Sequence, residues 1–194
     1  MWARYCELER PRVPSPAMRI IGGRLKRAVL KAPRGRDVRP TTDKVREALF
    51  NVLQARISIE GVRVLDLFAG TGALGLEALS REAERAVFVE ADASVLRVMK
   101  GNAHALGIAE ACSFVRSDAL KWLRNPARQR FDLVFADPPY DLDEIPALPG
   151  LVRPHLAENG LFVLEHDTRQ QFDDEPSRVM SRAYGRTVIS MFTP

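Results

Sequence analysis

VLDLFAGTGALGLEAL, residues 64–79, is the stretch of this sequence that decides the fold. Apolar residues lead into Asp66, a turn containing Gly70, Thr71 and Gly72 follows, and apolar residues then recur about once per helical turn. This order predicts a buried strand, a tight turn and a helix, the first unit of a dinucleotide-type α/β fold. We expect Gly70 and Gly72 to let the backbone close on a ligand, because neither carries a side chain.

A second apolar strand is predicted over Arg85–Glu90, and its last residue is an acid about 20 residues after the glycines. In a doubly wound sheet an acid at this place accepts hydrogen bonds from ribose hydroxyls, although a solvated strand end is the alternative. With Asp66 before it, the turn fits a ligand without a pyrophosphate, such as adenosine joined to a sulfonium amino acid whose amine meets Asp66.

FDLVFADPPYD, residues 131–141, predicts a buried parallel strand followed by Asp137, Pro138, Pro139 and Tyr140. Open α/β sheets bind ligands outside the carboxyl ends of their strands, so these four residues are expected to face the same crevice as the glycine turn. The two prolines alone are also compatible with a simple strand terminator.

Three further elements complete the predicted sheet and its helices. A helix is expected from Asp92 to Leu106 with Gly107 as its C-cap, then a strand that ends before Asp118, whose carboxylate either caps a helix or meets an adenine amino group. A proline-interrupted helical region over 142–159 precedes a strand over 161–166. Two antiparallel strands are expected around Gly185.

Composition indicates one ordinary globular domain without a membrane span. The 194 residues are 46% hydrophobic and 28% charged, and residues 1–17 lack the apolar core of a secretory signal. Cys6 and Cys112 have no metal or redox spacing, so both are expected to be free thiols in the cytoplasm. No metal site is expected, because the three histidines are scattered and are predicted to lie on the surface: His104, His155 and His166.

Charge is concentrated at the N-terminal end. Residues 1–40 contain eleven Lys and Arg against three Asp and Glu, and the net charge of the whole chain is only +4. Residues 1–17 are expected to be a disordered extension, with Met18 as an alternative start. From Met18 two short strands are predicted around Gly22 and Gly23, and this hairpin carries cations that can follow a phosphate backbone; a solvated basic tail is the alternative. The basic residues are Arg19, Arg24, Lys26, Arg27, Lys31, Arg34, Arg36 and Arg39.

A helix is predicted over RPTTDKVREALFNVL, residues 39–53, because Thr41 or Thr42 can cap it and Asp43 lies in the favourable first turn. Arg46 and Glu47 are expected to be exposed on this helix.

Taken together, these stretches resemble the RsmD family of bacterial methyltransferases, which methylate the exocyclic N2 of one guanine in small-subunit ribosomal RNA. The resemblance runs from Met18 to Pro194 in order and spacing, and residues 1–17 lie outside it. It implies a Rossmann-like class I S-adenosylmethionine-dependent methyltransferase with a mostly parallel seven-stranded sheet and helices on both faces. The implied division is an RNA-binding β-hairpin at 18–40 and a methyltransferase domain at 41–194.

The resemblance also implies roles for individual residues. S-adenosylmethionine would contact Asp66, Phe68, Gly70, Thr71, Gly72, Glu90, Ala91, Asp118 and Ala119. The target base would meet Asp137, Pro138, Pro139 and Tyr140, and 16S ribosomal RNA, free or within an assembling subunit, would contact Arg19, Arg24, Lys26, Arg27, Lys31, Arg39 and Arg46. A monomer without metal is expected.

Other functions remain compatible with the same motifs. A DNA adenine-N6 methyltransferase would use this fold, but such enzymes usually add a target-recognition insertion for which the chain leaves no room. A protein glutamine methyltransferase usually has Asn where Asp137 stands. A non-catalytic RNA-binding assembly protein is a further alternative, against which the intact Asp137 and Gly-Thr-Gly turn argue.

Overall fold

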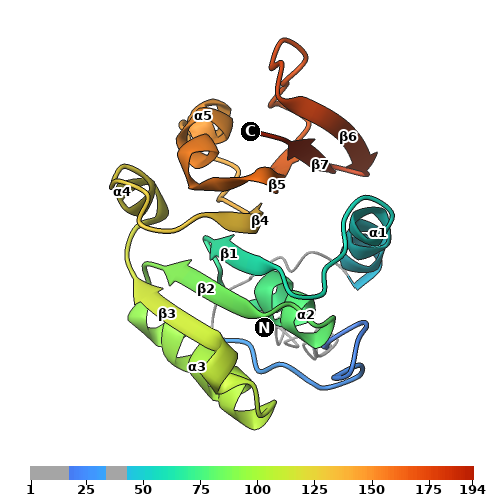
Figure 1. The fold of residues 1–194 in the computed structure, drawn as a ribbon, viewed down its shortest axis with the longest axis vertical. Coiled ribbons are helices and arrows are strands. Elements are labelled where there is room, and N and C mark those ends of the chain that lie inside the picture. The colour runs from blue at the N-terminus through green and yellow to red at the C-terminus, as the bar shows by residue number, and fades with distance from the viewer. Residues whose placement is uncertain (1–17, 34–42) are drawn as a thin grey trace, which may run out of the picture.

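The computed structural model of the protein describes residues 18–33 and 43–194. The fold is built on one seven-stranded sheet. Its strands are β1 (Arg63–Leu67), β2 (Arg85–Glu90), β3 (Cys112–Arg116), β4 (Phe131–Ala136), β5 (Leu156–Asp167), β6 (Arg178–Tyr184) and β7 (Thr187–Phe192). They lie in the order β3-β2-β1-β4-β5-β7-β6 (Figure 1). Strands β1 to β5 are parallel, and β7 is antiparallel to both β5 and β6. The predicted mostly parallel sheet is confirmed.

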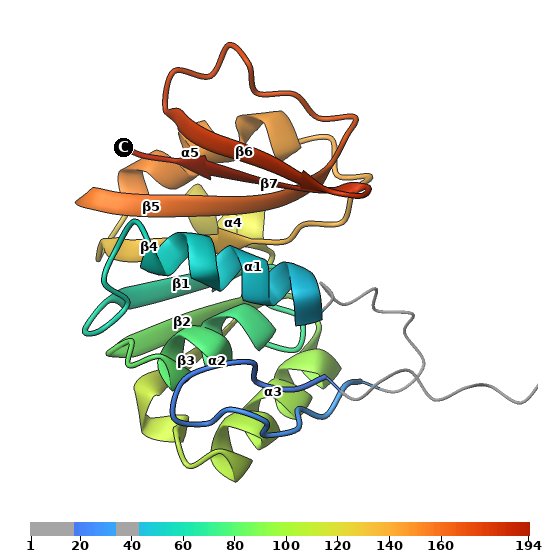
Figure 2. The same ribbon diagram turned by 90° about the vertical axis from the view of Figure 1, so that its right-hand side faces the viewer.

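Helices cover both faces of the sheet, as predicted. They are α1 (Asp43–Gln54), α2 (Ala73–Ser80), α3 (Ala93–Ala105), α4 (Ala119–Leu123) and α5 (Leu148–Val152). Figure 2 shows α1, α2 and α3 in front of the sheet and α4 and α5 behind it. Each face therefore has its own apolar core: Phe50, Phe88 and Phe135 lie in one, and Phe131 and Phe162 lie in the other.

The order of the strands reverses between β1 and β4. The chain runs outward from β1 through β2 to β3, and then returns to the other side of β1 as β4. The carboxyl ends of β1 and β4 consequently point to the same edge without a covering connection between them. Such a switch point is where open α/β sheets hold their ligands.

Two elements differ from the sequence-based expectation. The helical region over 142–159 consists of short pieces, because Pro146, Pro149 and Pro154 each stand in the first turn of a new helical segment and prevent one continuous helix. Strand β5 begins at Leu156 instead of Leu161, and its pairing with β4 shifts register after the Phe131–Leu156 pair.

The segment 18–33 folds back on itself, but its two halves do not form the two predicted strands. One antiparallel bridge joins Arg19 and Val29, and Gly23 adopts a left-handed φ of 72° at the bend. Ile20 and Leu30 are buried in the core under the segment, and burying each side chain contributes about 1.5–3 kcal/mol. Figure 2 shows the segment lying over α2 and α3. Residues 1–17, Arg34, Arg36 and Arg39 lie outside the described residues.

Candidate functional site

The turn after β1 has the backbone that its glycines predict. Gly70 and Gly72 have φ of 53° and 77°, and Phe68 also adopts a left-handed φ of 55°. A Cβ on Gly72 would stand 2.8 Å from Cγ of Met99, so this glycine is required by packing against the core. Of the two glycines, only Gly70 lines the cavity described below. The close approach that requires Gly72 is therefore to the side chain of Met99 in the core, whereas Gly70 borders the cavity.

Asp66 is buried beneath this turn. Its Oδ2 accepts a hydrogen bond of 2.9 Å from the backbone N–H of Gly75. Burial, and to a lesser degree the charge of Glu90, raises the pKa of Asp66 to about 8, although the Gly75 bond opposes the shift. Asp66 does not line the cavity. In this structure it ties the strand end to the start of α2.

Two acids at neighbouring strand ends face the cavity. Oε2 of Glu90 accepts from the N–H of Gly70 at 3.0 Å, and its Oε1 accepts from the N–H of Asp92 at 2.8 Å. Asp118 is the N-cap of α4, and its Oδ1 accepts from the N–H of Lys121 at 2.8 Å. Asp118 thus caps a helix and also lines the cavity, so a capping role does not exclude the predicted contact with an adenine amine.

Asp137, Pro138, Pro139 and Tyr140 follow β4 directly, as predicted. The hydroxyl of Tyr140 donates to Oε1 of Glu165 at 3.3 Å and lies 3.1 Å from Oγ1 of Thr187. The backbone carbonyl of Tyr140 accepts from Nη2 of Arg169 at 2.9 Å. Burial raises the pKa of Tyr140 to about 12, so its hydroxyl stays protonated at neutral pH. The ring is therefore anchored at its far end.

A cavity of about 880 Å³ joins these elements at the carboxyl edge of the sheet. Eleven residues predicted for the cofactor and target base line it: Phe68, Gly70, Thr71, Glu90, Ala91, Asp118, Ala119, Asp137, Pro138, Pro139 and Tyr140. Asp66 and Gly72 are the two predicted site residues that do not. The sequence reasoning missed Glu165 and the turn 184–187, which line the same cavity. The local sequence around Glu165 is that of an ordinary strand, and residues 184–187 are those of an ordinary turn between two strands, so neither could be identified as part of a site.

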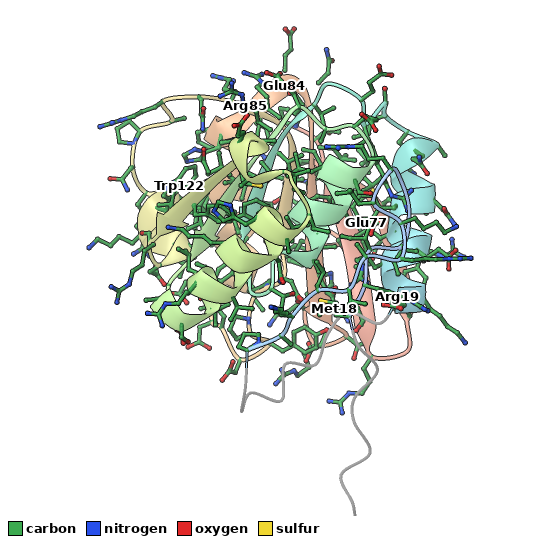
Figure 3. All side chains as sticks on the ribbon, turned by 90° about the horizontal axis from the view of Figure 1, so that it is seen from below. Met18, Arg19, Glu77, Glu84, Arg85 and Trp122 are labelled. Atoms are coloured by element: carbon green, nitrogen blue, oxygen red, sulfur yellow. The ribbon has the colours of Figure 1, made fainter. Side chains whose placement is uncertain are left out.

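The basic segment 18–33 is fixed to the helices by buried polar contacts. Oε2 and Oε1 of Glu77 accept from the N–H groups of Ile21 and Gly22, each at 2.7 Å, and Oε1 also accepts from Nε of Arg81 at 2.8 Å. Glu77 is fully buried in α2. Figure 3 shows Glu77 beside this segment and Trp122 on a distant part of the surface. The amide of Asn102 in α3 holds both the N–H and the carbonyl of Lys31.

All five basic residues that were predicted in this described segment to bind RNA are exposed: Arg19, Arg24, Lys26, Arg27 and Lys31. Arg19 pairs with Asp43 at 2.9 Å, and Arg24 lies 3.7 Å from Glu82; both pairs are exposed. The segment also reaches the cavity, because Pro33 lines it and Sδ of Met18 accepts from the hydroxyl of Thr71, another lining residue. The cations therefore start at the mouth of the cavity and extend away from it over α2.

The predicted exposure of Arg46 is wrong. Its side chain is 1% exposed, and Nη2 donates to the carbonyl of Arg19 at 2.6 Å and to Oδ1 of Asp43 at 2.9 Å. Arg46 lies on the same face of α1 as the buried Leu49 and Leu53, and burial lowers the pKa of its guanidinium. Arg46 supports the backbone of the basic segment and does not present its charge to RNA. Glu47 is exposed, as expected.

The predicted surface location is also wrong for two histidines. His155 and His166 are each 2% exposed, and only His104 lies on the surface. Nε2 of His155 lies 3.0 Å from the carbonyl of Leu123, and Nε2 of His166 lies 2.9 Å from the hydroxyl of Ser190. Nδ1 of His166 also has a partner, the carbonyl of Asp167 at 2.8 Å, whereas Nδ1 of His155 has none among the described residues. Hydrogen bonds therefore compensate the burial of His166 at both ring nitrogens and that of His155 at one.

Within residues 18–33 and 43–194, no group of three or more His, Cys, Asp or Glu side chains is arranged to hold a metal ion. No helix of this described part is long and apolar enough to cross a bilayer. Cys112 is a free, half-buried thiol, and Cys6 lies outside the described residues.

Comparison with known proteins gives consistent matches over nearly the whole chain. Residues 18–193 match the family described as "Conserved hypothetical protein 95". The putative rRNA methyltransferase YlbH of Bacillus subtilis is 38% identical over 182 residues, which cover 90% of this chain and 98% of that protein. Ribosomal RNA small subunit methyltransferase D of Escherichia coli K12 is 36% identical over 165 residues, covering 84% and 81%.

Solved structures agree. The putative methyltransferase yhhF of Escherichia coli superposes with a TM-score of 0.79 at 33% identity, covering 91% of this chain and 97% of that one. The fold is the Rossmann-like fold of class I methyltransferases, as predicted. By the extent of these matches, the chain belongs to the RsmD family.

Proposed function

We propose that this protein transfers a methyl group from S-adenosylmethionine to the exocyclic N2 amine of a guanine in 16S ribosomal RNA. The observation that carries the proposal is one continuous cavity lined both by the acids Glu90 and Asp118 and by Asp137 and Tyr140. Relatives named as ribosomal RNA methyltransferases support the reaction and the class of substrate.

The acids at the ends of β2 and β3 suit an adenosine derivative. Glu90 uses each carboxylate oxygen once with a backbone N–H, and each oxygen keeps a lone pair for a ribose hydroxyl. Asp118 uses Oδ1 for its helix cap, so Oδ2 can accept from an adenine amine. S-adenosylmethionine, when bound, supplies a methyl group made electrophilic by its sulfonium. Because this activation is built into the cofactor, the chain has to supply orientation and exclusion of water.

The residues after β4 suit an aromatic amine. The lone pair of a guanine N2 is delocalised into the ring, which makes it a poor nucleophile. The carboxylate of Asp137 and the carbonyl of Pro138 can each accept one of its hydrogens, which favours a pyramidal nitrogen with its lone pair directed outward. Tyr140, anchored through its hydroxyl, can stack on the base outside its RNA context. A strong base is unnecessary, because the amine proton becomes acidic only as the bond to carbon forms.

RNA would run along the segment 18–33. Its cations are exposed, carry no aromatic neighbour in the segment and begin at the cavity, so they suit phosphates better than bases. Replacing Arg24, Lys26 and Arg27 together by Gln should lower the slope of log K against log salt by roughly two to three units. The affinity for S-adenosylmethionine should not change. An unchanged slope would show that RNA lies elsewhere.

The decisive experiment is methyl transfer from labelled S-adenosylmethionine to 16S ribosomal RNA and to small subunits isolated from a strain that lacks the protein. Digestion to nucleosides and mass spectrometry identify the product. We expect N2-methylguanosine at one position. A parallel reaction with DNA would support the adenine-N6 alternative if it yields methylated adenine, and RNA binding without transfer would support the assembly protein. An RNA substrate also implies that the reaction occurs in the cytoplasm.

A further inference from the structure

Glu165 is a second carboxylate in the part of the cavity that would receive the base. It lies in β5, is 5% exposed and lines the cavity. Its Oε1 accepts from the hydroxyl of Tyr140 at 3.3 Å, and the two oxygens of a carboxylate can accept from several donors at once. The Asp-Pro-Pro-Tyr sequence and the acids at the ends of β2 and β3 explain the proposed reaction without it.

Strand pairing sets Glu165 beside Asp137. In the parallel pair of β4 and β5, Phe135 is opposite Val163 and Ala136 is opposite Leu164. Strand β4 ends at Ala136, so Asp137 and Glu165 are the residues that directly follow this last pair, one just beyond β4 and the other within β5, and neighbouring strands are about 4.8 Å apart. Side chains alternate along a strand, and Phe135 and Val163 share one core. Asp137 and Glu165 therefore point to the same side of the sheet, and both line the cavity.

Two neighbouring carboxylates match the edge of guanine. Guanine carries two adjacent hydrogen-bond donors, the N2 amine and N1–H, whereas adenine carries an amine beside an N1 that has a lone pair. With the amine at Asp137, the adjacent ring nitrogen faces Glu165. A carboxylate accepts from N1–H and repels a lone pair.

Accordingly, we infer that Glu165 accepts a hydrogen bond from N1–H of the target base and selects guanine against adenine. This inference rests on the proposed function and makes Glu165 a specificity-determining residue of the same site. Its hydrogen bond with Tyr140 also links base selection to the ring that stacks on the base.

The test compares the natural target guanine with 2-aminopurine at the same position of a synthetic RNA joined into 16S ribosomal RNA. 2-Aminopurine keeps the amine but has no N1–H. The proteins are the wild type, Glu165→Gln and the control Glu158→Gln, which changes an exposed glutamate of the same strand. The amide of Glu165→Gln can donate to an unprotonated N1. Both kcat/KM and the affinity are measured for each RNA, the latter by competition and by the fluorescence of 2-aminopurine.

We expect the wild type and Glu158→Gln to favour guanine by tenfold to a hundredfold, and Glu165→Gln to lose most of that ratio. If Glu165 only stabilises the fold, Glu165→Gln should lower kcat/KM equally for both RNAs and leave their ratio unchanged. Should Glu165→Gln be inactive, the ratio of affinities decides. A preserved ratio together with guanine methylation by the wild type overturns this inference alone. Adenine methylation by the wild type overturns the proposed function as well.

Discussion

Glu77→Gln tests whether one buried carboxylate in α2 fixes the segment 18–33 to the rest of the fold. The carboxylate accepts from two backbone N–H groups at 2.7 Å and from Arg81 at 2.8 Å. An amide keeps one accepting oxygen and turns the other atom into a donor that faces a donor. Losing one hydrogen bond to a charged group costs about 1.5–3 kcal/mol.

The buried charges raise that cost. The side chains of Arg46 and Arg81 are 1% and 9% exposed, and both lose a countercharge in Glu77→Gln. Removing one partner of a buried ion pair costs about 3–5 kcal/mol, so we expect the free energy of unfolding to fall by that amount. For a protein of this size the midpoint of thermal unfolding should fall by about 6–20 °C.

Urea unfolding measures the change, and amide hydrogen exchange locates it at Ile21 and Gly22. The matched control is Glu82→Gln, which removes an exposed acid 3.7 Å from Arg24 of the same segment and should cost under about 1 kcal/mol. RNA affinity should fall in Glu77→Gln and stay unchanged in Glu82→Gln. If the free energy of unfolding falls by under about 1 kcal/mol and exchange at both amides is unchanged, Glu77 does not fix the segment 18–33 to α2.

Three other changes test two acids that line the cavity, Asp137 and Glu90, and the buried Asp66 beneath the glycine turn. Asp137→Ala should abolish methyl transfer and leave the affinity for S-adenosylmethionine within about tenfold, by calorimetry; equal loss of both would make Asp137 a cofactor residue. Glu90→Ala should weaken that affinity by about tenfold to a hundredfold, because it removes the hydrogen bonds that we propose between Glu90 and ribose; unchanged affinity contradicts the assignment. Burial raises the pKa of Asp66 from its ordinary 3.8 to about 8, so ionising it destabilises the fold as pH rises between these values. Asp66→Asn should therefore gain stability relative to the wild type between pH 5 and pH 8 in urea unfolding, whereas a constant difference would refute the shift.

The main features of the site were predictable where short-range physics decides them. The turn after β1 needs residues that tolerate positive φ, and only glycine does so without strain, so Gly70 and Gly72 mark it in the sequence. The parallel strands alternate with helices, which restricts the sheet to few topologies. Asp137 and Tyr140 follow a strand directly, and the carboxyl end of that strand fixes where they lie.

Residues whose partners are far along the chain could not be predicted. Arg46 looks like an ordinary exposed helix residue until the carbonyl of Arg19, 27 residues earlier, is placed against it. The acceptor role of Glu77 depends on Ile21 and Gly22, 56 and 55 residues away. Glu165 meets Tyr140 only because β5 pairs with β4 in one particular register.

The sequence by itself thus determined the strand–turn–helix unit, the class of fold and the placement of the two motifs at strand ends, because backbone preference and periodicity act within about ten residues. The tertiary structure alone decided which charges are buried and which acids share the cavity. Burial depends on how the layers pack, because a side chain is shielded from water by neighbours that lie far from it along the chain. Arg46, Glu77 and Glu165 owe their roles to that packing.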